Sequence, residues 1–435
     1  MKKALLCLFA AALVLLCMLA FPQTAHAASA DDLTFTLNET GDGYIVSNCD
    51  HFAEGELTIP ASYNGLPVTA IGDSAFYWCP SLTGITIPDS VTTIGEDAFE
   101  ECSSLASVTI GNSVTSIGES AFQYCSGLTS VTIPDSVTTI GEYAFSYCDN
   151  LTSIQVEEGN PVYHSAGNCI IETETKTLVT GCQTSQIPTD GSVTTIGKGA
   201  FCGYTSLIGI TIPDNITTIG EDAFLNCYNM TGITISNTVS TIGNSAFGGC
   251  SSLTDITIPD SVTTIGEFAF FWCTSLTNIT IPDSVTSIGN SAFHNCTGLT
   301  SVTILDGVTD IGEYAFIGCS RLTSVTYCGT QEQWDAIEIS EYNDPIISAT
   351  LQFHNIENDV CTICGFGKDI PGDMNADGKM NYQDAVYLLL NTLFGETAYP
   401  LNDANADMDG NGTVNSEDAI YLLLHVMFGE ANYPL

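Results

Sequence analysis

An Ile-Gly pair recurs at a fixed interval of 23 residues through most of this chain. The surrounding pattern, Ile-Gly-x-x-Ala-Phe, is present in ten copies, with one interruption after the fourth. A period of about 20 to 29 residues is typical of leucine-rich solenoids, in which each coil buries its apolar side only against its neighbours. We therefore expect a repeat, or solenoid, fold with one short strand in each 23-residue coil. The ten copies begin at Ile71, Ile94, Ile117, Ile140, Ile196, Ile219, Ile242, Ile265, Ile288 and Ile311.

The first coil shows how one unit is built. Leu82, Ile85 and Ile87 are spaced to point inward from a short strand, while Thr86 points outward. Pro88 cannot donate a hydrogen bond to a neighbouring strand, so the strand should end there. We expect the other side of the coil to be lined by Ala75, Phe76, Val91 and Ile94.

The outward threonine recurs in nine units and is replaced once, by Gln155. Such a row of hydroxyls could bind a protein or a glycan through many weak hydrogen bonds. Threonine is also the residue that an exposed strand prefers, so the row alone does not establish binding. The threonines are Thr86, Thr109, Thr132, Thr211, Thr234, Thr257, Thr280, Thr303 and Thr326.

Nine of the ten units carry a cysteine eight residues after the isoleucine, and the tenth has Tyr204 there with Cys202 nearby. One interpretation is a stack of disulfides or metal-binding thiolates, since export implies an oxidising compartment. The other is a ladder of buried thiols that act as small apolar side chains. We favour the ladder, because an odd number of thiols cannot pair fully. The nine are Cys79, Cys102, Cys125, Cys148, Cys227, Cys250, Cys273, Cys296 and Cys319.

The repeat pattern also suggests domain boundaries. We expect an N-terminal cap at residues 28–56, the solenoid at 57–327, and a C-terminal cap with a linker at 328–370. The interruption should form one enlarged, irregular coil at 156–195, with two strands between Cys169 and Val179. That coil could be a binding feature or a spacer.

The units resemble the bacterial BspA-like leucine-rich-repeat family, whose repeat reads L-x-x-I-x-I-P-x-x-V-x-x-I-G-x-x-A-F-x-x-C. The resemblance covers residues 57–327 and rests on ten copies in register. It implies a surface or secreted interaction protein without shared catalytic residues.

Two twelve-residue segments near the C-terminus carry the spacing of calcium-binding loops. Each places oxygen donors at the first, third, fifth, ninth and twelfth positions, a backbone carbonyl at the seventh and a glycine at the sixth, a set of hard ligands that calcium prefers. We expect two Ca²⁺ ions. The first loop offers Asp373, Asn375, Asp377, Lys379, Asn381 and Asp384, and the second Asp407, Asp409, Asn411, Thr413, Asn415 and Asp418.

Each loop leads into an apolar-faced helix that ends in Phe-Gly. The two loop-helix halves resemble a type I dockerin, which implies a small all-α, EF-hand-like module at residues 371–435. In that family calcium folds the module, which then binds a cohesin domain of a scaffold protein. The positions that bias cohesin choice would be Tyr382, Gln383, Ser416 and Glu417, and they depart from the Ser-Thr pairs common among dockerins.

A zinc site at His354, Cys361 and Cys364 is a weaker alternative for the segment before this module. A closed structural zinc site needs four ligands, and the sequence offers no convincing fourth. A local disulfide or two free thiols fit better.

The N-terminus and the charge bear on location and partners. Residues 1–27 read as a signal peptide with a cleavage site after Ala27, so we expect a secreted protein that is extracellular or held at a cell surface through a scaffold, with no membrane insertion after cleavage. An uncleaved anchor is the alternative. The chain carries 50 acidic and 7 basic side chains, a net charge of −43 that disfavours nucleic acid and anionic membrane partners.

The carboxylates of the repeats recur at fixed positions and show no unique pair of the kind that glycoside hydrolysis needs. We therefore expect no enzyme, but an interaction protein that docks on a cohesin, as in cellulosome-type complexes, and uses its repeats to adhere to a host or plant cell-wall protein or glycan. A free adhesin with a calcium-stabilised module and, less favoured, a polysaccharide-degrading enzyme with a dockerin are the alternatives.

Overall fold

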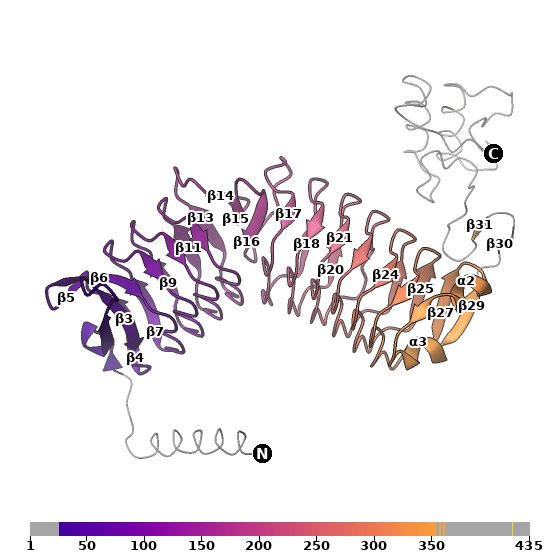
Figure 1. Cartoon of the computed structure of the whole chain (residues 1–435), viewed down its shortest axis with the longest axis horizontal. Helices are drawn as coiled ribbons and strands as arrows, with labels where there is room; N and C mark the ends of the chain where they lie inside the picture. Colours follow the sequence, from indigo (N-terminus) through magenta and orange to yellow (C-terminus); the bar gives the residue numbers. More distant parts are fainter. Residues whose placement is uncertain (1–25, 354–355, 358–359, 362–419, 421–435) are drawn as a thin grey trace, which may run out of the picture.

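The computed structural model of the chain describes residues 26–353, 356–357, 360–361 and 420. In this part the coils stack side by side into an arch, which bends where β14 to β17 lie (Figure 1). The expected leucine-rich solenoid is confirmed.

Most regular coils contribute two strands, one more than the sequence pattern predicts. The first is the predicted strand, as in β7 (Leu82–Thr86), and the second is a two-residue strand that ends at the isoleucine of the Ile-Gly pair, as in β8 (Thr93–Ile94). The second strand forms because hydrogen bonds from Gly95 N to Ile71 O and from Thr92 N to Thr69 O join successive coils there too. Before the bend the two ladders continue through β9 (Ser107–Thr109), β11 (Ser130–Ile133) and β13 (Ser153–Val156), and through β10 (Ser116–Ile117) and β12 (Thr139–Ile140).

Residues ahead of the first regular coil complete the N-terminal end of both ladders. β3 (Tyr44–Cys49) pairs antiparallel with β2 (Leu33–Leu37) and parallel with β6 (Leu66–Ile71), while β4 (Ala53–Thr58) pairs with β7. β1 (His26–Ala27) pairs with β4 but falls inside the predicted signal peptide. The remaining elements are a 3₁₀ turn, η1 (Ala30–Asp32), and β5 (Ser62–Tyr63), which pairs with β6.

The enlarged coil holds the two predicted strands, β15 (Cys169–Glu172) and β16 (Thr177–Thr180), and a third, β14 (Tyr163–Ala166). The three run antiparallel, and β16 then pairs parallel with β17 (Thr195–Ile196), where the regular ladder resumes. The insertion is thus built into the sheet and separates the two halves of the solenoid.

Beyond the bend the short-strand ladder is continuous, whereas the long-strand ladder is broken into β18 with β20 and a later group that starts at β23. The short strands are β19 (Thr218–Ile219), β21 (Thr241–Ile242), β22 (Thr264–Ile265), β24 (Ser287–Ile288), β26 (Asp310–Ile311) and β28 (Glu338–Ile339). The long strands are β18 (Gly209–Thr211), β20 (Gly232–Thr234), β23 (Asn278–Ile281), β25 (Ser301–Leu305), β27 (Ser324–Cys328) and β29 (Thr350–Phe353). The last coil is flanked by α2 (Gln331–Asp335) and α3 (Asp344–Ser348), and β30 (Ile356–Glu357) pairs with β31 (Val360–Cys361).

The core consists of columns of identical side chains that run from coil to coil. The phenylalanine of each Ala-Phe pair is buried and, within each half of the solenoid, stacks on the next one, with ring centroids from 4.7 Å (Phe76 to Phe99) to 5.5 Å (Phe224 to Phe247) apart. Burying one large aromatic ring per coil removes roughly 150 to 250 Å² from water each time. The stacks therefore supply much of the adhesion between coils.

A clasp of two tyrosines bridges the bend. Tyr143 lies over Gly199 of the next regular coil and donates a hydrogen bond to the carboxylate of Asp222, one coil further on. Tyr147 lies over Gly203 in the same way and accepts a hydrogen bond from the Asn226 amide.

An ion pair reinforces this clasp. Lys198 contacts the carboxylates of Glu142 and Glu221, on the coils to either side, at 2.9 and 3.4 Å. These contacts join three successive regular coils at the point where 33 extra residues interrupt the period, so they connect the two halves of the solenoid.

The clasp predicts that Gly203→Ala destabilises the protein. A methyl group at Gly203 would overlap the Tyr147 ring, and the residue has a φ of +77°, which favours glycine. Gly191→Ala is the control, because Gly191 has a φ of +82° but open space around it. We expect Gly203→Ala to lower the free energy of unfolding by about 1 to 3 kcal/mol more than the control in urea titrations. Equal losses would show that the tyrosine contact is unimportant.

Candidate binding groove on the strand face

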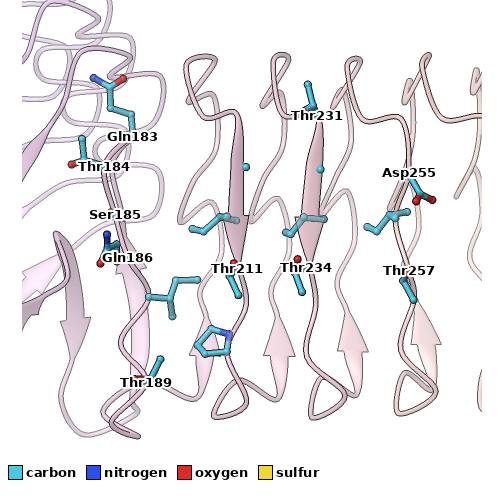
Figure 2. A pocket seen from close by; sticks show the side chains of 17 residues that line it. Gln183, Thr184, Ser185, Gln186, Thr189, Thr211, Thr231, Thr234, Asp255 and Thr257 are labelled. Atoms are coloured by element: carbon cyan, nitrogen blue, oxygen red, sulfur yellow. The ribbon is translucent and has the colours of Figure 1, made fainter. Parts of the chain in front are cut away.

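An open groove of about 850 Å³ lies on the strand face just after the bend. One wall is the segment 183–189 at the end of the enlarged coil, and the floor is formed by β18, β20 and the coil segment at 255–257 (Figure 2). The groove therefore lies at the junction between the insertion and the regular repeats.

The floor of the groove carries glycine at the same position of two successive strands. Gly209 and Gly232 stand where other coils carry Ser107, Ser130 or Asn278. Ile210 and Ile233 are only partly buried, as is Val108, whereas their counterparts in the other coils are buried.

Gly232 is not required by the fold. A Cβ built on it meets nothing within 4 Å, and its φ is not positive. Glycine weakens a strand by roughly 0.5 to 1 kcal/mol relative to alanine and often marks a place where a ligand or another backbone approaches closely. The glycine therefore points to an external contact at this position.

Local hydrogen bonds fix the wall of the groove. Ser185 Oγ donates to Asn168 O at 2.6 Å and accepts from Cys182 N at 2.8 Å, and Thr184 Oγ1 donates to Thr152 O at 2.7 Å. Within the described part of the chain, the side-chain amides of Gln183 and Gln186 have no hydrogen-bond partner, and Figure 2 places both residues at the groove wall.

The edge of the sheet is open at the same place. β18 pairs with β20 alone, and no backbone hydrogen bond joins it to residues 183–189 of the described structure. Amides, hydroxyls and a strand edge surround an isoleucine floor, and Asp255 is the one charged residue that lines the groove. Such a lining suits a neutral ligand rich in hydrogen-bonding groups.

The threonine row largely follows the prediction. Thr86 to Thr280 are exposed, including Thr211, Thr234 and Thr257 in the groove, and Thr303 is half-buried. The expectation was wrong for Thr326, which is 8 % exposed. It lies in register with Gln352 of the strand that ends the sheet, next to a longer side chain than a threonine.

The prediction of a buried thiol ladder is confirmed. All nine ladder cysteines are free and buried. From Cys102 onward each thiol donates to a phenylalanine carbonyl of the preceding coil, as Cys227 Sγ does to Phe201 O at 3.1 Å. Tyr204 takes the missing place, because its hydroxyl donates to Phe145 O at 3.0 Å. The thiols therefore pack successive coils together.

Burial sets the chemistry of these thiols. It raises the pKa of Cys319 to about 12 and that of Cys250 well above the usual value, so both stay protonated. Cys79 differs because it begins the ladder. The neighbouring thiols of Cys102 and Cys49 and the nearby His51 ring lower the pKa of Cys79 in spite of its burial.

The predicted calcium ligands and cohesin-recognition residues lie outside the described residues, as do His354 and Cys364 of the weaker zinc alternative. Cys361 ends β31. Among the described residues, one group could hold a metal ion: His26, Asp32 and Asp50. Signal cleavage after Ala27 would remove His26 from it.

The BspA type leucine rich repeat region matches residues 69–178, 175–270 and 240–343, and the dockerin type I domain matches residues 371–425. The chain belongs to the BspA-type leucine-rich-repeat family. Its C-terminal segment is a dockerin type I domain, and both matched domains are non-catalytic in kind. In the described part of this BspA-type protein, every helix is too short or too polar to span a bilayer.

Several solved structures are similar to this chain. A leucine rich cell surface protein from Faecalibacterium prausnitzii is 26 % identical, with a TM-score of 0.37 over 73 % of this chain and 99 % of that one. A leucine-rich repeat protein from Bacteroides ovatus is 26 % identical, with a TM-score of 0.35 over 75 % and 99 %. The pneumococcal vaccine antigen PcpA is 16 % identical, with a TM-score of 0.44 over 77 % and 100 %. No curated protein sequence matches the chain.

Sequence reasoning missed the groove. The available signal was the glycine at two successive outward strand positions, Gly209 and Gly232, where the other repeats carry a polar side chain except for Gly84 in the first. The wall could not be found in this way, because it comes from the part of the chain where the repeat is interrupted.

The thiol ladder predicts an order of reactivity. In the folded protein at neutral pH, iodoacetamide should modify Cys79 before Cys125, Cys250 or Cys319, because alkylation requires the thiolate and only the pKa of Cys79 is lowered among the four. All four thiols are buried to a similar extent, so access does not set the order. Peptide mass spectrometry after timed quenching measures the order, and the protein unfolded in urea, where all thiols react, is the control. Uniform labelling of the folded ladder would contradict the buried, protonated thiols.

Proposed function

We propose that this protein is a secreted, non-catalytic interaction protein that docks on a scaffold through its dockerin and presents its solenoid to a second partner. The observation that carries the proposal is the dockerin type I match at residues 371–425. This match contains both calcium-type loops, from Asp373 to Asp384 and from Asp407 to Asp418.

Calcium is the proposed cofactor. Both loops offer side-chain oxygens and a backbone carbonyl, and neither includes a nitrogen or sulfur ligand. A module of about 60 residues has a thin core, so an ion that binds only the folded state adds to its stability. Two bound ions would fold the module, and the first loop would use Asp373, Asn375 and Asp377 among its ligands.

The proposed docking partner is a cohesin domain of an extracellular scaffold, as in a cellulosome-type complex. Dockerins in general bind cohesins, and Tyr382, Gln383, Ser416 and Glu417 are the candidate recognition residues. These two pairs differ from each other, so the two halves of the module would present different surfaces to a cohesin.

The groove on the strand face is the proposed site for the second partner, a protein or a glycan of a host or plant cell wall. Three features support it. The fold does not require a glycine at position 232, and the side-chain amides of Gln183 and Gln186 have no hydrogen-bond partner in the described wall. The groove is also lined by a single charged residue, although the chain has a net charge of −43. A free adhesin with a calcium-stabilised module remains the second candidate, because the groove would serve that function equally.

Calcium removal should abolish cohesin docking. The full mature chain should bind a member of a panel of cohesin domains in calcium and lose that binding in excess chelator. Asp373→Ala combined with Asp407→Ala should reproduce the loss, because each change removes the first ligand of one loop. Asp89→Ala with Asp283→Ala, in two solenoid turns, is the control and should bind normally. Calcium-induced helix formation without binding to any cohesin would favour the free adhesin.

Filling the groove should block the second partner without harming the fold. Gly232→Val adds a β-branched side chain in open space, so we expect it to raise the free energy of unfolding by about 0.5 to 1 kcal/mol. Ligands found on protein and glycan arrays should lose binding to this variant and keep it for Ser301→Val, which changes the equivalent strand position outside the groove. A destabilised Gly232→Val would instead assign the glycine a structural role.

A further inference from the structure

One coil carries bulky aromatic residues at two backbone positions that favour small ones. In every regular coil, two turn residues have a left-handed backbone, one just before the Ala-Phe pair and one just before the ladder cysteine. Neighbouring coils place Ser245 and Ser291 at the first position, and Gly249 and Asn295 at the second. The coil of Ile265 instead carries Phe268 (φ 56°) and Trp272 (φ 58°). A left-handed backbone is unfavourable for large side chains, so these two residues strain the turn.

Among the described residues, neither ring contacts an aromatic ring of the next coil; both contact Phe271 of their own coil. Most other aromatics at these positions have aromatic or glycine partners in the next coil: Tyr124 stacks on Tyr147 and Tyr314 on Tyr342, while Tyr143 covers Gly199. Trp78 is the exception, and its ring contact is with the single residue His51. Phe268 is 39 % exposed and Trp272 is 52 % exposed, so both rings are open to a partner. Unfavourable backbone geometry that is retained at an exposed site is characteristic of functional positions.

The two residues belong to an aromatic patch of four side chains: Phe268, Phe271, Trp272 and His294. Phe271 lies edge-on to Phe268, with centroids 5.7 Å apart, and edge-on to His294 at 5.2 Å, and it is tilted against Trp272 at 6.0 Å. Its central ring thus supports the exposed faces of its neighbours. None of the four lines the groove, so the patch is a separate surface.

The surroundings of the aromatic patch carry no positive charge. The exposed Glu267 is adjacent to Phe268, and no lysine or arginine occurs in this coil or in the coils before and after it. Burial lowers the pKa of His294, so its ring is neutral at neutral pH. Aromatic faces are the negative part of the ring quadrupole and attract cations, most often the arginine guanidinium.

We propose that the aromatic patch binds a basic segment of a partner protein, with arginine side chains packed on the rings of Trp272 and Phe268. The net charge of −43 complements such a segment and speeds its encounter with the protein. Tryptophan and arginine are also the residues that most often dominate binding energy at protein interfaces. A neutral sugar ring could stack on the same rings but would gain no attraction from the negative charge of the protein.

The repeats supply matched variants for the test. Phe268→Ser with Trp272→Gly installs residues that neighbouring coils carry at the same positions, so the fold should keep or gain thermal stability. Trp78→Gly is the control, because Trp78 occupies the same position in the first coil, with a φ of 54° and 45 % exposure, but lies far from the aromatic patch. The overall charge is the same in all three proteins.

The probe is a short fluorescein-labelled peptide of alternating glycine and arginine, titrated with the full mature chain at an ionic strength of about 0.15 M, where long-range attraction is screened. Fluorescence anisotropy should show a Kd about 5- to 30-fold weaker for the double variant, as expected for the loss of cation–π contacts. Trp78→Gly should bind like the unmodified chain.

Three results would overturn the proposal. Equal affinity of the double variant and the unmodified chain would mean that the peptide responds to net charge alone. Binding of neutral xylo-oligosaccharides at Trp272, without arginine-dependent binding, would assign the aromatic patch to glycans. A lower melting temperature of the double variant would show that the aromatics serve the fold.

Discussion

Contact between identical positions of successive coils is the interaction on which the whole structure depends. A single coil cannot bury its phenylalanine, its isoleucines or its thiol, and each becomes buried only when the next coil repeats it in register. The stacked rings and the bonds from thiols to phenylalanine carbonyls, such as Cys273 Sγ to Phe247 O at 3.2 Å, follow from that rule. A position can vary only where its side chain leaves this stack.

The glycines show the same rule at the level of the backbone. A Cβ on Gly118 would overlap the backbone of Gly95 and Glu96, so the Ile-Gly pair is fixed by the close approach of neighbouring coils. Gly232 has no such neighbour, and its lack of a side chain serves nothing within the chain. Comparing the repeats thus distinguishes a glycine that the fold requires, Gly118, from one that the fold only tolerates, Gly232.

How much could be predicted from the sequence follows from this periodicity. The inward isoleucines, the buried thiols and the two strands after Cys169 could be predicted, because each is a local pattern repeated in register. The second strand at Thr93 was missed because two residues give no alternation to detect. The bond from Tyr143 to Asp222 spans 79 residues and depends on how the enlarged coil brings distant repeats together, which no local pattern encodes. The groove wall at Gln183 and Gln186 was missed for the same reason.

Departures from the repeat therefore carry most of the information on function. Where a residue that departs from the repeat makes a contact inside the chain, as Tyr147 does with Gly203, it joins the coils on either side of the interruption. Where the fold gives no reason for the departure, as with the open space at Gly232 and the exposed ring of Trp272, we infer that it serves a contact with another molecule. Because every coil supplies the reference residue for its neighbours, this comparison needs no related sequence. The groove and the aromatic patch are the two outward-facing surfaces at which the ten otherwise similar units differ in this way.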